Sequence, residues 1–200
     1  MAQDTLLGFP AHTLPYRRGE FTTLSTVSPV SFRLALNGSF RAFSFGGNDM
    51  NDAEYMRLAL ALAERGRGWT APNPMVGAVI VKDGAVIGQG WHERYGEPHA
   101  ERNALAACTA DPAGATMYVT LEPCQMCAGA IVQARIPEVV MGCMNPKAGC
   151  AGSILNILQM PEFNHQVAVT RGILEEECSN MLKTFFKELR LRLRQEKENS

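Results

Sequence analysis

The sequence predicts a layered α/β domain with a partly parallel sheet, and three observations lead to this prediction. After residue 50, segments with strand character alternate with segments with helical character, which favours helices packed on a sheet. The composition, with 46% hydrophobic and 20% charged residues, is typical of a soluble globular protein. No apolar run approaches the ~18 residues that a membrane span needs, so we expect no membrane association.

The expected elements follow one another through short loops. Asn51 or Asp52 is suited to cap the first helix, Asp83-Gly84 is a hairpin turn signal, and Pro98 and Pro123 suit helix starts. In chain order the expected elements are a helix at 51–65, a hairpin at 75–92, a helix at 99–108, a strand at 115–121, a helix at 123–133, a strand at 138–144, a short helix at 154–159, a strand at 166–170 and a long helix at 174–194.

The chain divides by composition into three parts. Residues 1–49 are rich in Ser, Thr and Arg and contain no Lys, and they show no sustained helical period. We expect a poorly ordered extension there, with Met50 as the functional start; a transit-like segment or a functional arm are the alternatives. Residues 50–195 are expected to form one domain, and residues 196–200 a charged tail.

Charge and cysteine content limit the functional classes. A net charge of −1 gives no global nucleic-acid signature, so any basic surface must be local. Six cysteines are few for a disulfide framework, and no secretion signal accompanies them. We therefore expect a reducing, cytoplasmic location, in which a Cys-x-x-Cys pair is more typical of a metal or redox site.

A metal site is predicted where His99 and the Cys124–Cys127 pair follow proline residues. The spacing of the two cysteines places both sulfurs on one face of a helix, and a helix N-terminus favours thiolate over thiol. One His and two Cys give three ligands, whereas a structural zinc site needs four. Three ligands and an open position are typical of a catalytic zinc ion, which activates water near neutral pH.

A proton carrier is also present, because Glu101 lies two residues after His99. One carboxylate can protonate a ring nitrogen and then a leaving amine. The arrangement His-x-Glu…Pro-Cys-x-x-Cys is the signature of zinc deaminases, in which the Glu is not a ligand. A redox Cys-x-x-Cys would leave His99 and Glu101 unexplained, and a structural zinc would need a fourth ligand that the motif lacks.

From these motifs the chain resembles the cytidine-deaminase-like superfamily over about residues 51–194. The resemblance implies a three-layer α/β/α fold with a mixed five-stranded sheet and a CMP/dCMP-type zinc deaminase domain. It also implies one Zn²⁺ ion per subunit, held by His99, Cys124 and Cys127, with Glu101 as the catalytic proton shuttle.

Within the superfamily, the two halves of the chain resemble two different families. The segment PNPMVGAVIVKDGAVIGQGWHERYGEPHAE resembles the deaminase of bacterial riboflavin biosynthesis, whereas LEPCQMCAGAIVQARIPEVVMGC and the C-terminal segments resemble the tRNA wobble adenosine deaminase. The riboflavin family has a longer insertion between its zinc cysteines and is usually fused to a reductase domain. We therefore expect conversion of adenosine to inosine in a tRNA anticodon stem-loop, by a homodimer.

The resemblance also implies residues that contact the substrate. The tRNA family usually has Glu at the position of Asn73, Asn at that of His92 and Asp at that of Asn145, so these three positions depart from its pattern. The expected substrate-binding residues are Asn73, Val76, His92, Ala100, Leu121, Glu122 and Pro123. The expected nucleic-acid-binding residues are Asn145, Lys147, Phe185, Phe186, Lys187 and Arg190.

Two other functions remain as alternatives. The first is deamination of a small molecule, either the riboflavin-pathway pyrimidine or a free base or nucleoside such as guanine or cytosine. The second is a deaminase-like binding subunit without activity, which the intact Glu101 and the three intact ligands argue against.

Overall fold

The computed structural model describes residues 32–36, 39–43 and 50–199, which belong to two separate units, Met1–Gly47 and Asn48–Ser200. In the first unit, strands β1 (Phe32–Leu36) and β2 (Ser39–Phe43) pair antiparallel. The prediction of a poorly ordered extension falls mostly outside the described residues, but these two strands were not predicted. The sequence does carry a hairpin signal there, an Asn-Gly dipeptide between apolar segments, which the prediction overlooked.

The second unit is built on a mixed five-stranded sheet, as predicted. Its strands are β3 (Gly77–Lys82), β4 (Ala85–Trp91), β5 (Thr116–Leu121), β6 (Glu138–Cys143) and β7 (Ala168–Arg171), in the order β4-β3-β5-β6-β7. The β3–β4 and β3–β5 pairs are antiparallel, and the β5–β6 and β6–β7 pairs are parallel. Strands β3, β5 and β6 are buried along most of their length, which requires cover on both faces.

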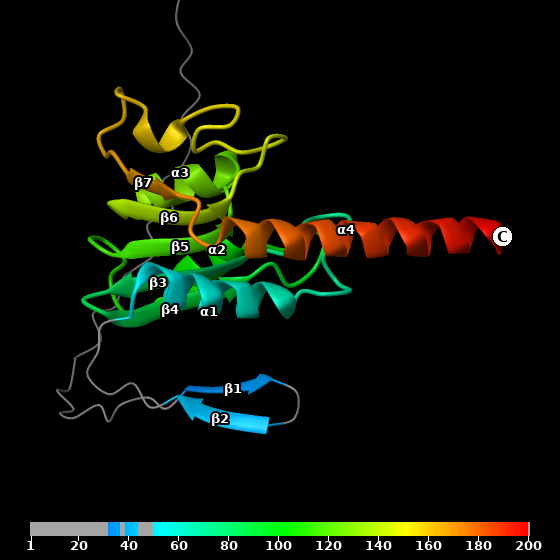
Figure 1. Cartoon of the computed structure of the whole chain (residues 1–200). Helices are drawn as coiled ribbons and strands as arrows, with labels where there is room; N and C mark the ends of the chain where they lie inside the picture. Colours follow the sequence, from blue (N-terminus) through cyan, green and yellow to red (C-terminus); the bar gives the residue numbers. More distant parts are fainter. Residues whose placement is uncertain (1–31, 37–38, 44–49, 200) are drawn as a thin grey trace, which may run out of the picture. The chain divides into compact units, whose positions relative to one another are not determined.

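Four helices provide that cover (Figure 1). They are α1 (Asp52–Glu64), α2 (Ala100–Ala106), α3 (Gln125–Gln133) and α4 (Glu175–Glu198). The first begins at the predicted cap, where the side chain of Asn51 accepts a hydrogen bond from the backbone of Glu54, and the side chain of Glu54 accepts one from the backbone of Asn51. Among the described residues, no helix is long and apolar enough to cross a membrane.

Close approaches at three glycines show which helix lies on which face. A Cβ atom on Gly77 would meet Ala59 of α1, one on Gly90 would meet Ala104 of α2, and one on Gly142 would meet Cys178 of α4. In the sheet, Ala78 pairs with both Gly90 and Val119, and Val119 pairs with Met141, so these residues share one face. Gly77 and Gly142 directly precede or follow members of this set in their strands, and they therefore point to the opposite face. Helices α1 and α4 thus cover one face of the sheet, and α2 covers the other.

Two predicted helices differ in length from those observed. The segment expected as a short α-helix at 154–159 contains only a 3-10 turn, η1 (Ile157–Gln159). The C-terminal helix was predicted to end near Arg194 but continues to Glu198, and its residues from 190 onward are exposed. The C-terminal end of this helix is exposed, so it has no apolar face. The spacing of apolar residues, which locates a buried helix, therefore does not indicate the residue at which this helix ends.

The contact between β3 and α1 gives a testable prediction. We expect Gly77→Ala to lower the free energy of unfolding by about 1–3 kcal/mol. The added Cβ would lie 2.0 Å from the backbone oxygen of Ala59 and 2.7 Å from the backbone nitrogen of Ala63, and neither atom can rotate away. Urea unfolding monitored by circular dichroism measures the change.

Gly129→Ala is the matched control, because a Cβ there meets nothing within 4 Å in helix α3. It should raise stability by about 0.5–1 kcal/mol. A Gly77→Ala protein as stable as the wild type would contradict the close packing of α1 on the sheet.

Candidate metal centre and active site

The three predicted metal ligands lie at the N-terminal ends of two helices. His99 is the N-cap of α2 and Cys124 the N-cap of α3, and neither side chain makes a capping hydrogen bond. Cys127 lies in the first turn of α3 and is buried. Both cap side chains are therefore available to a metal ion, although Cys124 was expected inside the helix rather than at its cap.

The ligand atoms are close enough to hold one ion. Nδ1 of His99 is 3.5 Å from Sγ of Cys124 and 3.5 Å from Sγ of Cys127, and all three atoms lie within 4.8 Å of one another. Zinc bonds of about 2.0–2.3 Å in tetrahedral geometry separate ligand atoms by roughly 3.5 Å. The described residues thus fit zinc, with three protein donors and a position left for water.

Local interactions favour the thiolate form at one of the three ligands. Hydrogen bonds with Cys127 and His99 lower the pKa of the Cys124 thiol to about 4, although burial acts in the opposite direction. Thiolate is the form that binds zinc. Hydrogen bonds with Cys124 raise the pKa of Cys127 and of His99, so these two ligands lose a proton when a metal binds.

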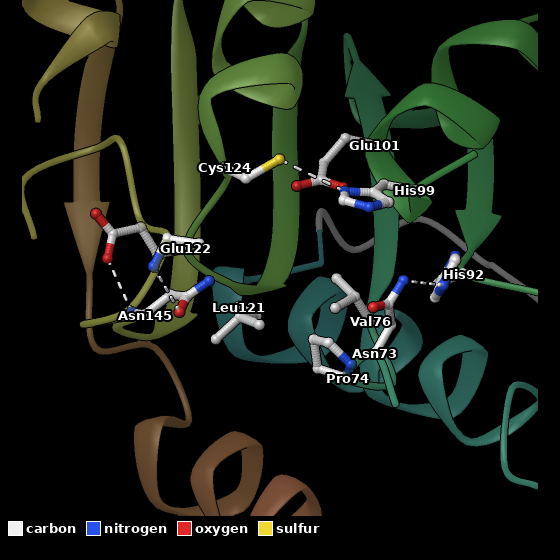
Figure 2. A pocket seen from close by; sticks show the side chains of 11 residues that line it. Asn73, Pro74, Val76, His92, His99, Glu101, Leu121, Glu122, Cys124 and Asn145 are labelled. Carbon is white, nitrogen blue, oxygen red and sulfur yellow. Dashed lines mark hydrogen bonds between the residues drawn. The ribbon is translucent and has the colours of Figure 1, made fainter. Parts of the chain in front are cut away.

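Glu101 lies beside the metal ligands with its side chain inside the protein. It is 3% exposed, and Figure 2 shows its carboxylate near His99 and Cys124. Burial raises the pKa of this carboxyl above its ordinary value, which brings the group closer to the range in which it can both accept and release a proton. The position suits the proton carrier inferred from the sequence.

A cavity of about 190 Å³ opens in front of these residues. It has room for one small heterocycle rather than for a larger ligand, since pockets for drug-sized ligands run to about 300–1,000 Å³. Its lining includes Pro74 and Ala148, which were not predicted from the sequence. The other lining residues are Asn73, Val76, His92, His99, Glu101, Leu121, Glu122, Cys124 and Asn145.

Asn73 and His92 form one wall of the cavity, and a backbone carbonyl fixes their orientation. Nδ1 of His92 lies 3.1 Å from the carbonyl oxygen of Pro98, which can only accept, so Nδ1 carries the proton. Nε2 is then the acceptor for the amide nitrogen of Asn73 at 3.3 Å. Figure 2 shows this nitrogen turned toward His92 and the oxygen on the other side of the amide. Asn73 therefore offers the cavity a hydrogen-bond acceptor.

Glu122 lies on the opposite wall of the cavity, and its carboxylate is bonded to the protein itself. Its carboxylate is 2% exposed and accepts hydrogen bonds from the backbone N–H groups of Asn145, Ala151 and Ser153, at 2.8–2.9 Å, and from the Ser153 hydroxyl. Burial alone would raise its pKa, but these hydrogen bonds together outweigh burial and lower it. Glu122 thus holds the loop that carries Asn145 and Ala148 in place.

Several predicted contact residues lie away from the cavity. Ala100 and Pro123 are buried and absent from its lining. Phe185 is 4% exposed and packs in the core against Phe186, so it is not available to nucleic acid. Its apolar period on α4 already indicated burial. Lys147, Lys187 and Arg190 are exposed.

The role of Glu122 can be tested by Glu122→Gln. An amide places an N–H group against N–H donors, so at least one buried donor loses its acceptor, and we expect a loss of about 1–3 kcal/mol in unfolding free energy. Chemical denaturation of zinc-loaded protein at pH 7 measures it. The exposed Glu162→Gln is the matched control; equal stability of the two variants would contradict the loop-anchoring role.

Comparison with known proteins agrees with this site. Residues 49–143 match the family model described as the cytidine and deoxycytidylate deaminase zinc-binding region. The chain is 42% identical over 157 residues to the tRNA-specific adenosine deaminase of Bacillus subtilis, covering 74% of this chain and 96% of that protein.

Two riboflavin-pathway proteins are similar to a comparable degree. The chain is 44% identical over 143 residues to riboflavin biosynthesis protein RibD of Actinobacillus pleuropneumoniae, covering 68% of this chain but only 37% of that protein. It is 39% identical over 147 residues to the diaminohydroxyphosphoribosylamino-pyrimidine deaminase of Buchnera aphidicola, covering 70% of this chain and 97% of that protein. With the His/Cys/Cys set in place, the chain belongs to the zinc-dependent deaminases of the cytidine and deoxycytidylate deaminase family.

Proposed function

We propose that the protein deaminates adenosine to inosine at the wobble position of a tRNA anticodon. The observation that carries the proposal is the C-terminal helix, whose exposed end presents Arg190, Arg192, Arg194 and Lys197. Lys and Arg side chains of this kind supply phosphate contacts, which a deaminase of a free base does not need. Similarity to the tRNA-specific enzyme of Bacillus subtilis over nearly its whole length supports the same reading.

The chain's own residues account for the proton transfers that the reaction needs. The zinc ion held by His99, Cys124 and Cys127 would supply activation of water. Glu101 takes the proton of the attacking water and passes it to the ring nitrogen next to the reacting carbon. It then takes the remaining proton of the added hydroxyl group and passes it to the leaving amine, so that adenosine and water give inosine and ammonia.

The proposed assembly is a homodimer. Large apolar side chains remain exposed on α3 and on the segment leading into η1, where Met126, Ile154 and Leu155 are 56%, 54% and 58% exposed. Burial of such side chains against a second copy would remove apolar surface from water.

A second candidate is deamination of the riboflavin-pathway pyrimidine. The Asn73–His92 pair supports it, because both residues lie in the segment that resembles the riboflavin-biosynthesis deaminase and they offer the cavity a fixed acceptor. The expectation that a riboflavin deaminase carries a reductase domain does not weigh against it, since the Buchnera aphidicola protein that bears the deaminase name is covered over 97% of its length.

The separate roles of the metal ligands and of the proton carrier Glu101 can be tested with two variants. Glu101→Gln should bind zinc as the wild type does but lose about 10²–10⁴-fold in deamination rate, because only the proton carrier is removed. Cys124→Ala should lose both zinc and activity, because one of three ligands is missing. Zinc content by inductively coupled plasma mass spectrometry and ammonia release measure the two effects; full activity of Glu101→Gln would refute the mechanism.

The substrate is tested by offering zinc-loaded protein two candidates side by side. These are an anticodon stem-loop RNA with adenosine at the wobble position, and the riboflavin-pathway aminopyrimidine. We expect inosine at the wobble position, detected by nucleoside mass spectrometry and absent with Glu101→Gln. Turnover of the pyrimidine without inosine would reject the tRNA proposal in favour of the second candidate.

A further inference from the structure

Two large aromatic side chains stand exposed on the loops that form one wall of the cavity. Trp69 is 61% exposed and lies on the loop between α1 and β3, and Tyr95 is 63% exposed and lies on the loop between β4 and α2. The same two loops supply Asn73 and His92 to the cavity. The fold therefore places two unburied aromatic rings on the segments that form the active site.

The exposed rings are held in place rather than loosely attached. The backbone N–H of Tyr95 donates to the carbonyl oxygen of Trp69 at 3.1 Å, which ties the two loops together. The guanidinium carbon of Arg94 lies 4.9 Å from the centre of the Trp69 ring, a cation–π contact that fixes the relative position of the two side chains. The Arg94 cation thus lies on the Trp69 ring, and the backbone of Tyr95 is tied to the backbone of Trp69.

This surface is connected to the cavity by short stretches of backbone. The N–H of Asn73 donates to the carbonyl oxygen of Thr70 at 2.8 Å, which closes a tight turn between Trp69 and the cavity wall. On the other loop, Arg94 follows His92 by two residues. Trp69 and Tyr95 thus lie within four and three residues of Asn73 and His92, on the same two loops that form this wall.

We propose that Trp69, Arg94 and Tyr95 form a stacking platform for an unpaired nucleobase next to the base that enters the cavity. The inference rests on the proposed action on RNA. A cavity of about 190 Å³ holds one heterocycle, so the neighbouring nucleotides of the strand must lie outside it. Exposed aromatic rings and Arg planes are the groups on which splayed-out bases of single-stranded loops stack.

The charges around the platform indicate stacking rather than phosphate attraction. Glu93 and Glu97 are exposed on the same loop as Arg94, so this loop is not basic. The phosphate-binding charge lies instead on the end of α4. Loss of the platform should therefore weaken RNA binding without changing its salt dependence, which reports the number of phosphate contacts.

The test uses the full-length zinc-loaded protein and two fluorescein-labelled RNAs. One is an anticodon stem-loop with adenosine at the wobble position, and the other lacks the bases on both sides of that adenosine. On the intact RNA, Trp69→Ala should raise Kd about 5- to 100-fold, with an unchanged slope of log Kd against log salt concentration, and Trp69→Phe should recover most of the affinity. On the abasic RNA, wild type and Trp69→Ala should bind alike.

The matched control is Phe163→Ala, which removes an aromatic ring that is 40% exposed on the segment before β7, at the other edge of the sheet. This variant should bind both RNAs as the wild type does. Equal binding of Trp69→Ala and wild type to the intact RNA, with inosine still formed, would overturn the platform alone.

Two other results would also overturn the platform, and each differs from loss of the platform alone. A wild-type protein that neither binds the stem-loop nor forms inosine would overturn the proposed function and the platform with it. If Trp69→Ala weakens both RNAs equally and halves the molecular mass in light scattering, the surface is an interface between two copies of the chain, and the platform is rejected.

Discussion

The site depends on one packing constraint, which is that the N-terminal ends of α2 and α3 lie side by side on one face of the sheet. His99 and Cys124 are the caps of these helices, so a shift of either helix by one turn would separate their ligand atoms by more than one ion can bridge. Gly90 fixes α2, because a Cβ there would lie 2.3 Å from the backbone nitrogen of Ala104. Backbone contacts between helix and sheet therefore set the positions of the metal ligands.

The same arrangement separates the chemical roles of the acidic groups. Cys124 lies at a helix N-terminus in contact with Cys127 and His99, which lowers its pKa, whereas burial raises the pKa of Glu101 one turn into the neighbouring helix. The lowered pKa of Cys124 favours the thiolate that binds a metal, and the raised pKa of Glu101 favours a carboxyl group that carries a proton. Opposite pKa shifts at neighbouring positions are how one site supports both roles at neutral pH.

Features set by local sequence could be predicted, and features set by long-range contacts could not. The cap at Asn51, the turn at Asp83-Gly84 and the spacing of Cys124 and Cys127 each act within a few residues, and the structure has all of them. The family resemblance implied that Glu122 contacts the substrate, and Glu122 does line the cavity. Its true partners lie 23–31 residues further along the chain, and no local pattern links them. These contacts hold the ends of the loop on which Ala148 lines the cavity.

The two walls of the cavity explain why the chain resembles two families at once. The metal ligands and Glu101 come from α2 and α3 and serve the chemistry common to all zinc deaminases. One wall, with Asn73 and His92, comes from the first half of the domain, and the other, anchored by Glu122, comes from the second half. Each wall is held by its own hydrogen bonds, and the ring of His92 also packs edge-on against the ring of His99, with centroids 5.4 Å apart. Both walls line the cavity, so residues of both halves of the domain would meet a bound substrate.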